Sequence, residues 1–167
     1  MTAWILDDGP FNDLAKIVRI EDLTGWPKDR LFVAEQTALD AESDSHRRTL
    51  LAADPTPFQS FKIMMGSPAF SIVYSHLRPT TSRATANLAE HQSIAWIISE
   101  RPDGIFVAKD KKAAFLALAE LGCGKVASPH DLWLWLRDEK LVDQTQFEGL
   151  CRTTCKGDQS RIPLRCQ

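Results

Sequence analysis

The sequence predicts an α/β fold in which helices flank a parallel sheet. Short apolar segments alternate along the chain with longer segments whose apolar residues recur at helical spacing, a pattern typical of βαβ units. The length of 167 residues suits one domain with a proper core. Hydrophobic residues make up 44% of the chain and charged residues 25%, and these proportions favour a globular protein.

The first half of the chain contains two clear strand candidates. Ala3–Leu6 is a short apolar segment, and Pro10 is well placed to open a helix behind it. Leu31–Ala34 predicts the second strand, with a helix after it. Residues 43–60 are polar and contain two prolines, which favours a loop or a short helix. The apolar stretch Phe61–Leu77 is broken by Gly-Ser-Pro, so we expect a strand before the break and a helix after it.

The second half repeats this alternation. Residues 86–99 form the clearest amphipathic helix. A strand follows over Gly104–Ala108, and then a helix over Lys112–Leu121 that Gly122 closes. The last predicted elements are a brief strand and a helix with a Ser-Pro start, over Lys125–Ala127 and Leu132–Arg137.

The charge and the termini narrow the class of protein. A net charge of −2 excludes a generally basic nucleic-acid binder, but it allows a nuclease whose acidic metal site offsets nearby basic residues. We expect no membrane span, because no uninterrupted apolar run approaches about 18 residues. The N-terminus lacks a basic segment followed by an apolar run, so we expect no secretory signal and a cytoplasmic protein.

Carboxylates recur where the predicted strands end, and ligands gather at this edge of parallel α/β sheets. Asp7 and Asp8 end the first strand, and Asp110 follows the strand of the second half. Asp40 lies about two turns into the helix after the second strand, and Glu90 lies in the first turn of the helix at 86–99. Such a cluster cannot ionise fully without a compensating charge, which Mg²⁺ or Mn²⁺ supplies. The pattern therefore indicates metal-assisted displacement at phosphorus.

Each acid also has a structural explanation. Glu90 suits the positive end of its helix dipole, Asp40 is an ordinary solvated helix residue, and Asp110 or Asp8 can cap a helix. Asp7 is the hardest to explain in this way, because a strand-end carboxylate before Gly-Pro has no obvious capping role.

Four segments, in this order, resemble the PIN-domain ribonucleases, a family that includes the VapC-type toxins. Residues 5–10 (ILDDGP) resemble the strand-end motif of the family, and residues 33–40 (VAEQTALD) its second strand and helix, with Asp40 where the family usually has glutamate. Residues 87–95 (NLAEHQSIA) resemble its Gly-Leu-Gly-Glu-x-x-x-Ile-Ala helix start. Residues 106–113 (FVAKDKKA) resemble its strand-end aspartate.

The resemblance implies a three-layer α/β/α fold with a central, mainly parallel sheet over residues 1–142. Residues 143–167 would be an extension of unassigned role. It also implies a metal-dependent endoribonuclease, the toxin of a toxin–antitoxin pair, with RNA as substrate, an antitoxin protein as partner and a tendency to form homodimers. The extension carries Cys151, Cys155 and Cys166. The residues implied as catalytic and as ligands of Mg²⁺ or Mn²⁺ are Asp7, Asp40, Glu90 and Asp110, with Asp8 as a further ligand.

Basic residues near these acids suit a substrate that carries phosphates. We expect contacts to RNA from four of them, Lys109, Lys111, Lys112 and Arg83, although a solvated charge run is the alternative.

Two other functions stay open. A signalling receiver domain also opens with a strand, an Asp-Asp pair and proline, and it would use Asp54 as phosphoacceptor and Lys109 as its lysine. A degenerate nuclease fold that serves as a binding module is the second.

Overall fold

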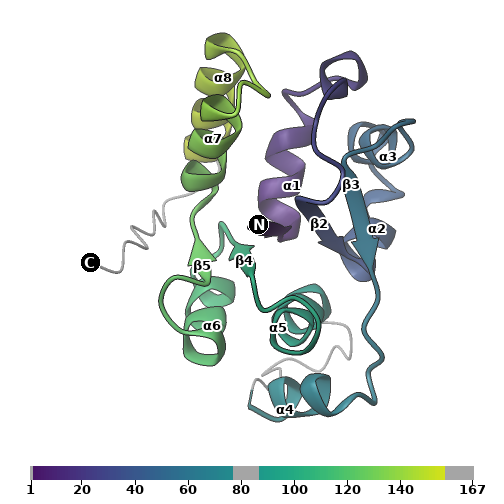
Figure 1. Cartoon of the computed structure of the whole chain (residues 1–167), viewed down its shortest axis with the longest axis vertical. Coiled ribbons are helices and arrows are strands. Elements are labelled where there is room, and N and C mark those ends of the chain that lie inside the picture. Colours follow the sequence, from purple (N-terminus) through teal and green to yellow (C-terminus); the bar gives the residue numbers. More distant parts are fainter. Residues whose placement is uncertain (1, 77–86, 157–167) are drawn as a thin grey trace.

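The computed structural model describes residues 2–76 and 87–156. Its centre is a five-stranded sheet in which every pair of neighbouring strands is parallel. The strand order is β3-β2-β1-β4-β5 (Figure 1). The strands are β1 (Ala3–Leu6), β2 (Leu31–Ala34), β3 (Phe58–Phe61), β4 (Gly104–Val107) and β5 (Val126–Ala127).

Helices cover both faces of the sheet, so the predicted three-layer α/β/α class is confirmed. Alternate residues of β1 supply the two cores: Trp4 and Leu6 belong to one, and Ala3 and Ile5 to the other. The first core is completed by α1 (Asp8–Ala15), α2 (Glu35–Ala41), α3 (Ser45–Leu51), α7 (Pro129–Asp138) and α8 (Gln144–Lys156). The second is completed by α4 (Pro68–His76), α5 (Leu88–Ser99) and α6 (Lys111–Leu121).

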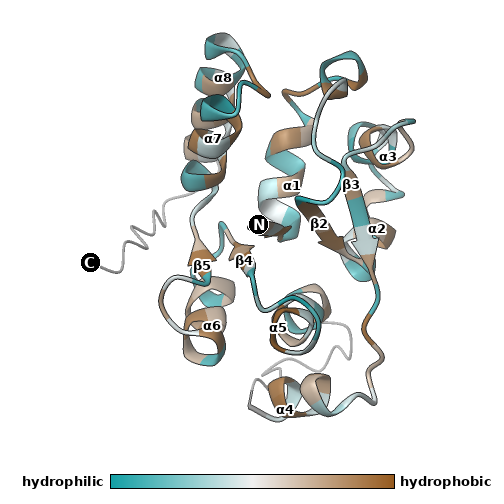
Figure 2. Cartoon of the chain, viewed as in Figure 1, coloured by the Kyte–Doolittle hydropathy of each residue, from teal (hydrophilic) through white to brown (hydrophobic). Residues whose placement is uncertain are grey.

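The predicted position of the edge strand β3 was wrong. We expected a strand between Phe61 and the Gly-Ser-Pro break, whereas the strand begins at Phe58 and ends at Phe61. Only its two phenylalanines are buried, and Gln59 and Ser60 between them are exposed. Figure 2 shows this polar centre beside the hydrophobic β2. A strand whose middle faces solvent carries little apolar signal, which explains the misplacement.

The helix α8 has no counterpart in the prediction. It packs against α7 and α1, and its Leu150 is fully buried in the first core. The described part of the C-terminal extension therefore shares the core of the preceding residues. Among the residues that the structure describes, no helix is long and apolar enough to cross a membrane.

The strand order has a topological switch point in the middle of the sheet. From β1 the chain moves outward in one direction to β2 and β3, and it later builds β4 and β5 on the other side. The direction of winding thus reverses between β1 and β4. Ligands bind at such switch points, outside the carboxyl ends of the strands.

Candidate functional site: an acidic cluster at the switch point

Asp7 lies directly at the switch point. It follows β1, and its backbone N–H donates a hydrogen bond of 3.0 Å to the carbonyl of Val107 at the end of β4. Asp7 is only 7% exposed, and its side chain makes no hydrogen bond that caps α1. Burial, followed by the negative charge of Glu90, raises the pKa of Asp7 to about 8, with smaller contributions from Asp8 and Asp110. The carboxyl group of Asp7 thus keeps its proton to a higher pH than an ordinary aspartate does.

Glu90 is repelled by the other acids of the group, including Asp40. It lies in the first turn of α5 and is half-buried. Burial raises its pKa, and the charges of Asp110, Asp8 and Asp40 raise it further. A residue that only balanced the helix dipole would be favoured in its charged form instead. Asp7 and Glu90 are thus the two buried or half-buried acids on which the charges of Asp8, Asp110 and, for Glu90, Asp40 act, whereas Asp40 and Asp110 are themselves exposed.

Three of these acids also make bonds within the protein. Asp110 caps α6, where its Oδ1 accepts from the backbone N–H groups of Lys112 at 2.7 Å and Ala113 at 3.2 Å. Asp40 accepts a hydrogen bond of 2.8 Å from the Gln36 amide. Asp8 forms an ion pair with Arg47.

The fit to a metal ion is a matter of charge and donor type. In residues 2–76 and 87–156, no group of three or more His, Cys, Asp or Glu side chains could hold a metal ion as they are positioned. The donors are nevertheless the hard carboxylate oxygens that Mg²⁺ and Mn²⁺ prefer, and their repulsion calls for a cation. Mg²⁺ usually keeps several of its water ligands and uses only one or two carboxylates. In donor type and charge, though not in its present spacing, the cluster suits an ion of that kind.

Arg47 is a residue that sequence reasoning missed. It lies on α3, in the polar segment that we interpreted as a loop or short helix, and no motif marks it. Its guanidinium donates to Asp8 and, at 3.5 Å, to the carbonyl of Asp40. The side chain is only 12% exposed. The structure thus adds a held positive charge to the rim of the acidic cluster.

The predicted phosphate contacts fall in different surroundings. Lys111 and Lys112 are exposed in the first turn of α6, next to Asp110. The ammonium of Lys109 lies 2.9 Å from Asp13 Oδ2, so a phosphate would have to compete with this ion pair. Arg83 lies outside the described residues.

The features of the rival receiver domain are not brought together. Asp54 is an exposed turn residue between α3 and β3, not a strand-end residue beside Asp7. Receiver domains have the strand order 2-1-3-4-5, which differs from the order found here.

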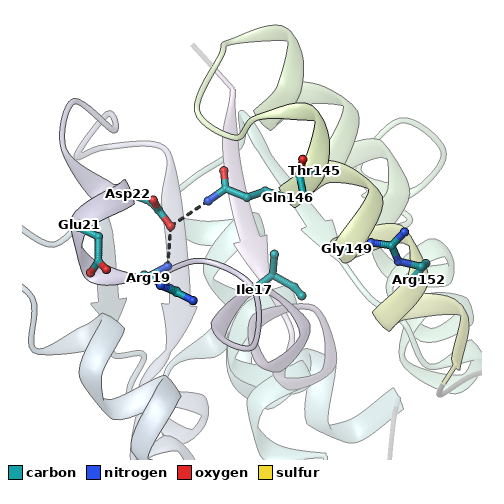
Figure 3. A pocket seen from close by; sticks show the side chains of 8 residues that line it. All are labelled: Ile17, Arg19, Glu21, Asp22, Thr145, Gln146, Gly149 and Arg152. Atoms are coloured by element: carbon teal, nitrogen blue, oxygen red, sulfur yellow. Dashed lines mark hydrogen bonds between the residues drawn. The ribbon is translucent and has the colours of Figure 1, made fainter.

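Two further features lie away from the acids. A cavity of about 440 Å³ between α8 and the short 3-10 helix at Ile20–Leu23 is shown in Figure 3, and none of its lining residues belongs to the cluster. The thiols of Cys151 and Cys155 are free, and the Sγ of Cys151 lies 3.5 Å from His130 Nδ1. Burial raises the pKa of Cys151, which favours the unreactive thiol form. Cys166 lies outside the described residues.

No family model matches this chain, and neither does any curated protein or solved structure. The resemblance to PIN domains therefore rests on the four sequence motifs alone.

Proposed function

We propose that this protein is a divalent-metal-dependent endoribonuclease of the PIN kind. The observation that carries the proposal is the placement of the buried Asp7 at the switch point between β1 and β4, where the half-buried Glu90 raises its pKa. Burying like charges together is unfavourable unless a cation compensates them. The four motifs that resemble the family supply these same acids.

The acids would bind the metal ion, and the lysines would bind the RNA. Asp7, Asp8, Asp40, Glu90 and Asp110 would hold Mg²⁺ or Mn²⁺, directly or through its water ligands. A bound ion of this kind lowers the pKa of a coordinated water and stabilises negative charge on phosphate oxygens. Asp7 would hold such an ion in its carboxylate form. Lys111 and Lys112 would attract the RNA backbone from the start of α6.

The biological setting is proposed from the resemblance. It is that of a cytoplasmic toxin, held in check by an antitoxin protein and able to form a homodimer. The sequence motifs are its only support.

The first test is RNA cleavage. A mixed RNA substrate is incubated with the protein and Mn²⁺, Mg²⁺ or EDTA, and Asp7→Asn is compared with the unaltered chain. We expect cleavage that needs the metal and that falls at least 100-fold in the variant, because the exchange preserves shape while removing a ligand charge. Asp54→Asn, which changes an exposed carboxylate far from the motifs, is the matched control and should cleave normally.

Other outcomes point to the remaining functions. An inert protein that still binds RNA would support the binding module, which is favoured by the internal bonds of Asp8, Asp40 and Asp110. Labelling by acetyl phosphate that disappears in Asp54→Asn would support the receiver domain and contradict the nuclease.

A further inference from the structure

A buried ion pair joins α1 to the residue that precedes Asp110. Lys109 Nζ and Asp13 Oδ2 are 2.9 Å apart, with side chains only 17% and 3% exposed. Removing two charges from water is costly, and buried pairs are often replaceable by apolar residues without loss of stability. Stability is therefore a weak explanation for this pair.

The pair joins three separate parts of the chain. Asp13 belongs to α1, and Lys109 lies between β4 and α6. Thr154 of α8 donates a hydrogen bond of 3.1 Å to the same Asp13 oxygen. Trp133 of α7 in turn donates from Nε1 to the Thr154 hydroxyl at 3.0 Å. The hydrogen bonds and the ion pair thus link α7 and α8 to two of the segments that carry acids of the cluster, α1 with Asp8 and the loop with Asp110.

Lys109 lies between the end of β4 and α1. It directly precedes Asp110, and its stem lies against the first turn of α1, where a Cβ on Gly9 would come within 3.3 Å of Lys109 Cβ. The same first turn begins at Asp8, immediately after Asp7. One side chain therefore spans from the strand-end loop of β4 to the helix that follows β1.

We propose that Lys109, Asp13 and Thr154 are positioning residues of the metal site. They hold the segment with Asp110 at a set distance from the segment with Asp7 and Asp8. This inference rests on the proposed function, since it assigns the network to the affinity of the site for the cation. It also gives α8 a role in the site. Supporting residues of this kind typically change metal affinity or activity by 10–100-fold.

The test uses Thr154→Val, which removes a hydroxyl of nearly the same volume and leaves both charges paired. We expect Mn²⁺ to bind at least tenfold more weakly by isothermal titration calorimetry. Cleavage should need correspondingly more Mn²⁺ for half-saturation, while the rate at saturating Mn²⁺ changes by less. Asp13→Asn, which removes the charge that holds Lys109, should weaken binding further.

Two variants of the same helix serve as controls. Thr154→Ser keeps the hydroxyl and should restore Mn²⁺ affinity. Thr153→Val makes the same chemical change one residue earlier, where the side chain has no hydrogen bond in the described structure, and it should bind Mn²⁺ like the unaltered chain.

The possible failures are distinguishable. If the unaltered protein does not bind Mn²⁺, the metal proposal falls, and the positioning role falls with it. If the unaltered protein binds Mn²⁺ and both Thr154→Val and Asp13→Asn bind it equally well, the positioning role alone is overturned. Equal weakening by Thr153→Val would also overturn it, because the effect would then belong to the helix as a whole.

Discussion

At the scale of single residues, Asp7 combines burial with the repulsion of other carboxylates. Its pKa is 3.8 in the absence of these surroundings and about 8 in the folded protein. Between these values the folded state holds a proton that the unfolded state has lost. Stability in the absence of metal must therefore decrease as the pH rises through this window. The raised pKa of Glu90 acts in the same direction.

This reasoning predicts that Asp7→Asn stabilises the metal-free protein at pH 8. The asparagine amide does not titrate in this pH range. The variant should therefore not show the part of the pH-dependent loss of stability that Asp7 causes. We expect a gain of at least about 1.4 kcal/mol at pH 8, the equivalent of one pKa unit, and little gain at pH 4. Urea unfolding in EDTA at both pH values measures the difference in free energy of unfolding between the variant and the unaltered chain. A variant that is less stable than the unaltered chain at pH 8 would contradict the assignment.

A second residue-scale prediction concerns Lys111 and Lys112. Replacing both by alanine should weaken RNA binding and reduce the dependence of log affinity on log salt by about 1.4, or about 0.7 for each lost phosphate contact. Binding is measured by fluorescence anisotropy in an Asp7→Asn background, which avoids cleavage. Lys28→Ala is the control. Lys28 is exposed and lies just before β2, at the end of the sheet where the strands begin, whereas Lys111 and Lys112 follow the end of β4. An unchanged salt dependence would favour the solvated charge run.

The acids of the candidate site were accessible to sequence reasoning because each one sits at a recognisable boundary. Asp7 and Asp110 follow short apolar runs, and Glu90 opens the clearest amphipathic helix. Arg47 was not accessible, because its contact with Asp8 joins residues 39 positions apart without any local pattern. The pair of Lys109 and Asp13, 96 positions apart, was missed for the same reason.

At the scale of elements, α8 shows how a polar sequence can become part of a core. Its apolar residues are few, but Leu150 is fully buried, and Gly149 lets the helix approach Ile17, since a Cβ there would come within 3.3 Å of that side chain. Periodicity over so few apolar positions is a weak signal, whereas the tertiary contacts with α1 and α7 are extensive. The helix was not predicted, although Phe147, Leu150 and Cys151 recur at helical spacing in its sequence.

We predict that Leu150→Ala destabilises the whole domain. Truncating a fully buried leucine should lower the free energy of unfolding by about 2–5 kcal/mol. Thermal or urea unfolding measures the change, with Thr153→Ala on the same helix as a control that should stay within about 0.5 kcal/mol. If Leu150→Ala were as mild as the control, α8 would be only loosely attached.

At the scale of the whole molecule, one sheet serves two hydrophobic cores. The alternation of strands and helices was enough to predict a parallel sheet, and this prediction is confirmed. The strand order was not predicted, because it depends on long-range pairing between segments such as β1 and β4, which are about 100 residues apart. The position of the switch point between β1 and β4 could consequently be read only from the structure.

Because both cores share the strands, we predict a single cooperative unfolding transition. Trp96 packs against Phe61 and Phe32 on one face, and Trp133 is buried on the other. Fluorescence of variants that retain a reporter on only one face should give the same midpoint as circular dichroism of that variant. A separate early transition reported by either face would show that the cores unfold independently.

The central position of β1 has a consequence for the synthesis of the chain on the ribosome. β1 pairs on one side with β2 and on the other with β4, which is made much later. The helix α8, which holds Leu150 and Thr154, is translated after every element it packs against. Domains acquire their structure as the chain emerges from its N-terminal end. In the proposed ribonuclease, activity would thus appear only after the messenger that encodes the domain has been read.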